Sequence, residues 1–303
     1  MGITIRKQIT LPVKKSFAVK PAVEKKIYSI PSALIEPSRN LGDYSWLIYG
    51  SKKIGKSTIA SLFPDALFFM FEPGAKALRI YRVDCGTWVD ALGFLSSLEK
   101  QKAAGELKHK TIVIDTAFEL YGKCFVWCLK ELGIDYPRDD NRGQDWTFIK
   151  NQVRDFHNRI FNLGIGVVIL CHETVKEQQT FTGTKYDQVV PLLDKRCDDL
   201  YRAVIDNVVW YHYRGKDRFL QIRGTDHAMA GIALQADEFF KTPSGEQIFA
   251  IPIPSEPKKG MQAILNAFNN RQNQTFKEET EKQSETAVKH SVNEKLRKAA
   301  KKR

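Results

Sequence analysis

The sequence predicts an α/β fold in which a mostly parallel sheet is flanked by helices. Two observations lead to this prediction. Short, almost wholly apolar segments recur along the middle of the chain, and segments with helical spacing of apolar residues separate them. Strands without polar alternation are typical of sheets buried on both faces, and their alternation with helices favours parallel pairing. With 303 residues, 43% of them hydrophobic, the chain can form one large domain with appendages.

The first half of this core contains three apolar strands. The run 45–49 leads into a glycine-rich loop and a short helix over 57–62, and a second run covers 66–71. The apolar residues of 87–103 share one face, which predicts a helix. A third strand, 111–115, is apolar up to a closing carboxylate.

The second half repeats the pattern and then changes to late antiparallel strands. In chain order we expect helices near 116–132 and 145–162, a strand over 166–171, a polar β-hairpin over 176–190 turning at Gly183, a helix near 193–204, a strand pair at 207–211 and 219–222, and a short helix over 261–268.

The positive charge is confined to the two flanks. Residues 1–40 hold eight basic and two acidic residues, residues 255–303 hold twelve and six, and residues 41–254 hold 27 of each. We therefore divide the chain into a basic N-terminal arm (1–40), a neutral core (41–254) and a basic C-terminal tail (255–303), disordered or helical. Basic arms on a neutral body suit a protein that meets a polyanion. The alternative is that they only promote solubility.

The sequence shows neither the apolar segments of a membrane protein nor the cysteine spacing of a disulfide framework or a zinc site. No segment approaches the roughly 18 apolar residues of a membrane span, and the N-terminus lacks the apolar block of a signal peptide. We therefore expect a cytoplasmic protein without a membrane partner. The five cysteines lack paired spacing, so Cys124 and Cys128 are expected to be core thiols rather than metal ligands.

The loop after the first strand matches a phosphate-binding pattern in full. Its glycines let backbone N–H groups turn inward around phosphates, Lys56 reaches the β and γ oxygens, and Ser57 offers its hydroxyl to Mg²⁺. The pattern lies between a predicted strand and a predicted helix, as this chemistry requires. It predicts ATP and Mg²⁺ as ligands of nine consecutive residues: Gly50, Ser51, Lys52, Lys53, Ile54, Gly55, Lys56, Ser57 and Thr58.

Three later strands end in polar groups, where parallel sheets place their ligand sites. Asp115 would hold Mg²⁺ together with Ser57. Glu72 would lie beside the γ-phosphate and orient or deprotonate the attacking water, unless it only pairs with a nearby lysine. His172 would sense the γ-phosphate and report its loss to the next loop, or be an ordinary surface histidine. Glu173 is the second candidate for the base.

These motifs together resemble those of the RecA-like P-loop ATPases. Within that group the chain is similar to the short RecA-core proteins of bacteriophages, AAA-type nucleotide-binding proteins proposed to act in single-strand annealing and recombination. The resemblance covers roughly residues 44–225. It rests on 49–58, on Phe71-Glu72-Pro73-Gly74, on Ile114-Asp115-Thr116 and on Leu170-Cys171-His172-Glu173 before the hairpin.

The resemblance implies an ATPase that self-associates head to tail, as a ring or a filament, with ATP at the subunit boundary. It also implies single-stranded DNA as partner, and the cytoplasm of a host cell if a phage encodes the chain. DNA would bind the loop 176–190, where the candidates are Lys176, Phe181, Lys185 and Tyr186. The family supplies a basic residue in trans from a late strand. Here that region lacks lysine, and Arg223 is the nearest substitute.

The leading hypothesis is a DNA-stimulated ATPase that promotes annealing or recombination of single strands. One alternative is an ATP-driven motor or loader in replication or packaging. Another is a small-molecule P-loop kinase, although the sequence offers no clear arginine-rich lid for such an enzyme.

Overall fold

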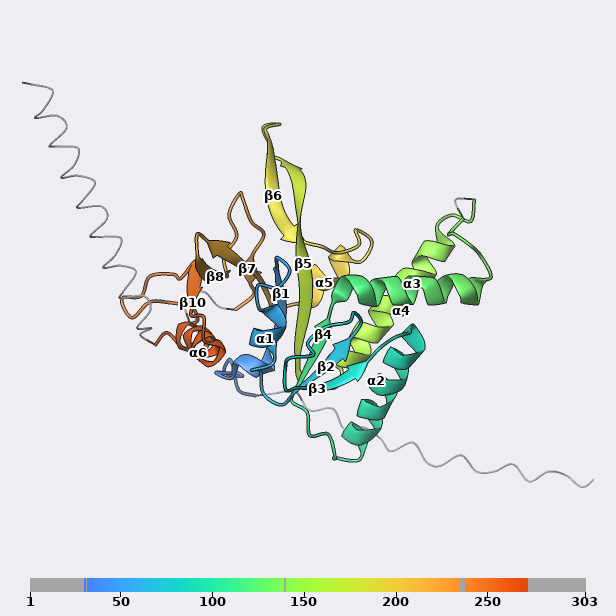
Figure 1. Ribbon diagram of the computed structural model, residues 1–303, viewed down its shortest axis with the longest axis horizontal. Helices are drawn as coiled ribbons and strands as arrows, with labels where there is room; N and C mark the ends of the chain where they lie inside the picture. The colour runs from blue at the N-terminus through green and yellow to red at the C-terminus, as the bar shows by residue number, and fades with distance from the viewer. Residues whose placement is uncertain (1–29, 31, 139, 235–237, 272–303) are drawn as a thin grey trace, which may run out of the picture. The chain divides into compact units, whose positions relative to one another are not determined.

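The structure is a computed structural model that describes residues 30, 32–138, 140–234 and 238–271. The chain divides at residue 38, and the described part of 38–303, which we call the body, contains the whole ten-stranded sheet (Figure 1). Most of the expected N-terminal arm, and the tail beyond residue 271, lie outside the described residues.

Within the described residues, ten strands form one sheet. The main path runs β10-β8-β7-β1-β5-β4-β2-β3, with β6 paired to β5 and β9 paired to β7. All strands from β7 to β3 along this path are parallel, which confirms the predicted fold class. These six strands are β1 (Ser45–Gly50), β2 (Ala66–Met70), β3 (Tyr81–Asp84), β4 (Thr111–Asp115), β5 (Gly166–Gln179) and β7 (Asn207–Arg214).

The late strands are antiparallel, as expected, but there are more of them. β8 (Asp217–Gln221) pairs with β7, and β10 (Ala250–Ile253) extends the sheet from β8. The two-residue β9 (Gly231–Ile232) also pairs with β7. The sequence pattern missed β3, β9 and β10, because β3 has no buried residue and the other two have at most four residues.

Alternating side chains of the buried strands feed two cores on opposite faces of the sheet. On β1, Leu47 and Tyr49 enter one core, whereas Trp46 and Ile48 enter the other. The first core is covered by α2 (Trp88–Ala103), α3 (Ala117–Leu132), α4 (Gln144–Phe161) and α5 (Asp198–Val204). It also holds Cys124 and Cys128, which are buried free thiols. The second is covered by α1 (Lys56–Ala60) and α6 (Pro257–Phe268).

The compact body extends beyond both expected boundaries of the core. Helix α6 buries Met261, Ile264 and Phe268 in the second core, so the body continues past residue 254. A helix was expected over 261–268 but was assigned to the tail, because polar and basic residues surround it. At the other end the body begins at Ser38 and continues through a short 3₁₀ helix, η1 (Leu41–Asp43).

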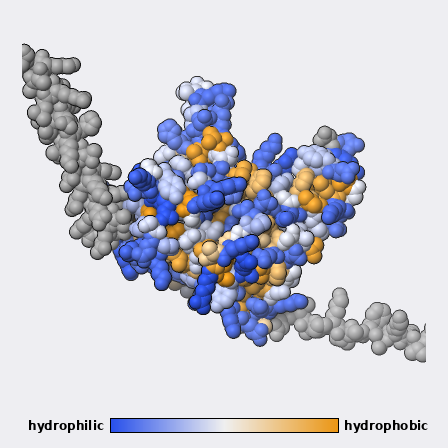
Figure 2. Space-filling model, in the orientation of Figure 1, coloured by the Kyte–Doolittle hydropathy of each residue, from blue (hydrophilic) through white to orange (hydrophobic). Residues whose placement is uncertain are grey.

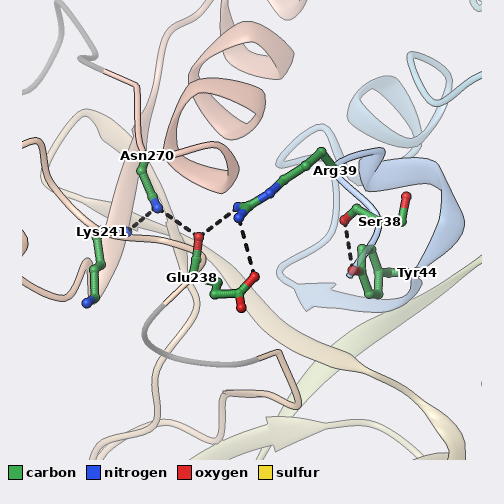
Figure 3. A network of polar contacts seen from close by, with 6 residues as sticks. All are labelled: Ser38, Arg39, Tyr44, Glu238, Lys241 and Asn270. Carbon is green, nitrogen blue, oxygen red and sulfur yellow. Dashed lines mark hydrogen bonds and ion pairs between the residues drawn. The ribbon is translucent and has the colours of Figure 1, made fainter. Parts of the chain in front are cut away.

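One polar network joins the two ends of the body (Figure 3). Arg39 donates to the backbone oxygen of Glu238 at 2.9 Å and to its carboxylate at 3.3 Å, and its guanidinium lies 4.5 Å from the centre of the Phe239 ring. Asn270 donates to the same Glu238 oxygen at 2.7 Å and accepts from the Lys241 backbone at 2.8 Å. The first and last segments of the body are therefore held together.

The hairpin of β5 and β6 (Lys185–Pro191) projects past the carboxyl ends of the other strands (Figure 1). Pairing with β6 starts at Glu173 and Pro191. The strand expected over 166–171 and the first arm of the hairpin expected over 176–190 therefore form one continuous strand, β5. The turn contains Gly183 at φ +89°, as predicted. Figure 2 shows mostly hydrophilic residues over this projection. In the described ranges, none of the helices combines the length and apolar content that a bilayer span requires.

Candidate nucleotide site

The glycine-rich loop connects β1 to α1 and requires glycine at both of its ends. Gly50 lies so close to β7 that a Cβ atom there would overlap the backbone oxygen of Tyr211. Gly55 caps the N-terminus of α1 with φ +110°, a conformation that side chains with a Cβ rarely adopt. The backbone geometry thus explains the two glycines of the motif independently of any ligand.

Lys56 is folded back on its own loop. Its side chain is almost fully buried, and its Nζ donates to the backbone oxygens of Gly50 and Ser51 at 2.8 Å each. Burial lowers the pKa of Lys56, and the nearby carboxylate of Asp115 opposes that shift. Phosphate oxygens are stronger acceptors of a charged donor than neutral carbonyls are. The arrangement therefore fits a lysine that transfers to a nucleotide phosphate.

Ser57 and Asp115 meet across the carboxyl edge of the sheet. The Ser57 hydroxyl donates to the Asp115 carboxylate at 2.7 Å. Asp115 is 5% exposed, and burial raises its pKa while the serine hydrogen bond lowers it. Two oxygen groups at a strand end and a helix start suit Mg²⁺, which prefers oxygen ligands. Ser57 and Asp115 are the residues that would hold Mg²⁺, whose charge would neutralise phosphate oxygens.

Glu72 and His172 face each other, with the Glu72 Oε1 and the His172 Nε2 3.6 Å apart. Burial is the main cause that raises the pKa of Glu72, and the neighbouring carboxylate of Glu119 adds to it. Burial, followed by Lys56 and Lys52, lowers the pKa of His172. The histidine is therefore neutral near pH 7, and its Nδ1 is buried without a hydrogen-bond partner among the described residues.

Glu173, the second candidate for the base, has a different environment. It follows His172 on β5, so its side chain points to the opposite face of the strand. Its carboxylate accepts a hydrogen bond from the Trp210 indole at 2.7 Å, and Trp210 stacks on His212. The indole occupies one oxygen of the Glu173 carboxylate, whereas the Glu72 carboxylate faces His172 at the nucleotide side of the sheet edge.

The four candidate DNA-binding residues are spread along the hairpin rather than clustered. Phe181 is fully exposed at the tip, and Tyr186 is half-buried on β6. Lys185 pairs with Glu177 at 2.8 Å, and Lys176, near the base, lies 3.8 Å from the Asp198 carboxylate. Both lysines therefore already have acidic partners.

Arg223 is turned into its own chain. Its Nε donates to the backbone oxygen of Ile248 at 3.1 Å, burial lowers its pKa, and its Nη2 is buried without a described partner. The role of Arg223 in trans stays a prediction, and it would require the guanidinium to leave these contacts.

Several residues near the site were not predicted from the sequence. They are Glu119 beside Glu72, Trp210 on Glu173, and Tyr211 and Arg218 against the phosphate loop. For Arg218 no sequence signal exists, because the register of the late strands alone brings it to the loop.

A glycine-rich loop between a parallel strand and a helix, with a buried lysine and a joined serine–aspartate pair, defines a P-loop ATPase. The sheet around it is mostly parallel and flanked by helices, as in an α/β P-loop core. The family described as AAA domain matches residues 43–234, and the chain belongs to that family.

Two known proteins show more distant similarity. The SPbeta prophage-derived uncharacterized protein YorG of Bacillus subtilis (strain 168) is 25% identical over 164 residues, which are 53% of this chain and 47% of that protein. The chain thus matches about half the length of this relative. The crystal structure of the KaiC-like protein PH0186 from Pyrococcus horikoshii OT3 aligns with a TM-score of 0.39 and 13% identity over 71% of this chain and 87% of that one.

Proposed function

We propose that this ATPase binds single-stranded DNA, is stimulated by it, and promotes annealing or recombination in a phage context. The observation that carries the proposal is the continuity of β5. One strand of 14 residues runs from the sheet, past His172 beside Glu72, to the turn that exposes Phe181. A change at the nucleotide can therefore reach the hairpin tip along a single element.

The hairpin offers stacking rather than charge. Its lysines have acidic partners, while an exposed phenylalanine can stack on an unpaired base for about 1–3 kcal/mol. Duplex bases are already stacked and do not present that face. Long-range attraction would come from the basic flanks, whose charge exceeds that of the neutral core.

In this proposal Glu72 accepts the proton of the attacking water, Lys56 neutralises the phosphates, and His172 responds to their loss. The similarity to a prophage-derived protein supports the phage context. Self-association head to tail, as a ring or a filament, is also part of the proposal, and Arg223 would have to leave Ile248 to supply a charge in trans.

The test is ATP turnover and oligonucleotide binding by Phe181→Ala, with Phe249→Ala as the matched control. Phe249 is 57% exposed on a different loop. We expect single-stranded but not double-stranded DNA to stimulate turnover, and Phe181→Ala to weaken single-strand binding roughly 5- to 100-fold, equivalent to one stacked base. Equal effects of the two substitutions would contradict the proposal.

Annealing and unwinding assays separate the proposal from its alternatives. Annealing of complementary strands supports it, whereas ATP-driven unwinding or translocation without annealing would favour a motor or loader. Phosphoryl transfer to a small molecule, with turnover indifferent to DNA, would favour a kinase.

A further inference from the structure

The crest of the phosphate loop is held in an unfavourable conformation. Lys53 has φ +65°, in the left-handed region that non-glycine residues seldom occupy. Such conformations cost about 1–3 kcal/mol and persist only where the surroundings stabilise them. Lys52 and Lys53 are both exposed, so their side chains provide little packing for the crest.

A residue far along the chain contacts the loop directly after this strained position. Arg218, on β8, donates from Nη1 to the backbone oxygen of Ile54 at 3.3 Å and from Nη2 to that of Pro254 at 3.4 Å. The same Nη1 lies 3.3 Å from where a Cβ on Gly55 would be. The guanidinium therefore connects the loop to the ends of two late strands.

The charge of Arg218 is not neutralised within the described chain. Both of its partners are backbone carbonyls, and none of the described carboxylates pairs with it. Tyr211 approaches Gly55 from the same side, and Arg218 lies close enough to oppose the burial that raises the pKa of the Tyr211 hydroxyl. Lys52, Lys53 and Lys56 add positive charge to the same loop. Without an anion these cations repel one another, and a nucleotide triphosphate would remove that repulsion.

We propose that Arg218 is a positioning residue of this ATPase, which braces the phosphate loop at Ile54 from within the same chain and adds an uncompensated positive charge behind it. This rests on the assignment of the loop as the ATP site. Arg218 acts on the nucleotide through the position of the loop and through the electrostatic field of its guanidinium. Because it lies on β8, it also couples the late antiparallel strands to nucleotide binding. Arg223, on the following segment, has no such position because its Nε is bound to Ile248.

The test compares Arg218→Ala and Arg218→Lys with Arg214→Ala. Arg214 lies on the same β7–β8 hairpin, and its substitution removes the same charge, but its guanidinium lies over the Phe219 ring, 4.8 Å from its centre. The measurements are the Kd of a fluorescent ATP analogue, kcat and KM for ATP, and the melting temperature with and without ATP.

We expect Arg218→Ala to raise Kd and KM about 10-fold, the usual loss for a hydrogen bond to a charged group, with kcat within about 3-fold. Its melting temperature without nucleotide should match the wild type, because the loss of the two hydrogen bonds to Ile54 and Pro254 is offset by the removal of one repelling charge, while the increase caused by ATP should shrink. Arg218→Lys keeps the charge but cannot contact two carbonyls with one planar group. Its Kd and KM should therefore lie between those of the wild type and of Arg218→Ala. Arg214→Ala should behave as the wild type.

Three results would overturn the proposal. One is unchanged Kd in Arg218→Ala. Another is equal weakening in Arg214→Ala, which would reduce the effect to overall charge. The third is a low melting temperature of both Arg218 variants without nucleotide, which would make the residue merely structural. Lys56→Ala marks the level of lost ATP binding, so a wild-type protein at that level would overturn the ATP site as well.

Discussion

At the scale of single residues, the site is arranged to exchange internal partners for those of a nucleotide. Lys56 is bound to two carbonyls of its own loop, and Ser57 is bound to Asp115. A phosphate could replace the two carbonyls that Lys56 now contacts, and Mg²⁺ could come between Ser57 and Asp115. For Lys56 the exchange replaces two neutral acceptors with charged ones, whose hydrogen bonds are roughly twice as strong.

Replacing Lys56 with Ala should weaken ATP binding by about 10- to 100-fold, because charged hydrogen bonds contribute about 1.5–3 kcal/mol. Titration with a fluorescent ATP analogue measures the change. Since the substitution also frees two loop carbonyls, thermal unfolding without nucleotide serves as the control. Wild-type affinity in a folded Lys56→Ala protein would refute the assignment of the loop.

Glu72→Gln should preserve ATP binding and reduce turnover by about 10²-fold or more, the usual contribution of a positioned base. The wild-type rate should fall as the pH drops through the pKa of Glu72, which burial and Glu119 raise above its ordinary 4.5, because only the carboxylate accepts a proton. Glu119→Gln removes one cause of that shift, so it should move the acid limb of the pH–rate profile to lower pH. Near-normal turnover in Glu72→Gln would transfer the role of base to Glu173.

Residue roles differed in how far the sequence could predict them. Ser57 and Asp115 were predicted as a pair and lie 2.7 Å apart, because the motif and the strand-end rule each specify a place in the fold. Arg218 and Glu119 could not be predicted. The position of Arg218 depends on the register of β8, and that of Glu119 on where α3 begins, rather than on local spacing. The roles of Glu72, His172 and the hairpin residues are still predictions.

At the scale of elements, buried parallel strands were predictable and exposed or very short ones were not. The strand 111–115 was expected with the bounds it has, because its apolar run is bounded on both sides. In contrast, β3 shows only exposed or half-buried side chains and left no apolar signal. Helix α6 was expected near the right place but as part of a tail, since its burial depends on the second core.

Truncation tests whether α6 is part of the folded body or of a dispensable tail. A chain ending at residue 271 should fold like the full protein. A chain ending at residue 254 loses Met261, Ile264 and Phe268 from the second core, at about 1.5–3 kcal/mol for each buried side chain. That loss approaches the whole stability of a typical domain, about 5–15 kcal/mol. Circular dichroism and urea unfolding provide the comparison, and a cooperative transition in the 254-residue chain would show that α6 is dispensable.

At the scale of the whole molecule, charge and chemistry occupy different parts of the chain. The body that carries the P-loop is electrically neutral over residues 41–254, whereas the excess charge lies in 1–40 and 255–303. Arg39 and Asn270 meet at Glu238, so one network joins the first and last described segments of the body (Figure 3). Polyanion attraction can thus change without any change in the nucleotide site.

Deleting residues 277–303 tests this separation. The deletion removes nine basic and five acidic residues and leaves the described body intact. Because released counterions set the salt dependence, binding to single-stranded DNA should weaken at low salt, and the log–log salt slope should become shallower by about 0.7 for each phosphate that the tail no longer neutralises. ATP turnover without DNA should stay at the full-length rate.

Phe181→Ala should show the opposite pattern, with weaker binding at every salt concentration and an unchanged slope, because stacking releases no counterions. The measurement is a titration of labelled oligonucleotide at several salt concentrations. An unchanged slope after the deletion would place the phosphate-binding residues elsewhere on the chain, and a fall in basal turnover would show that the tail acts on the ATP site.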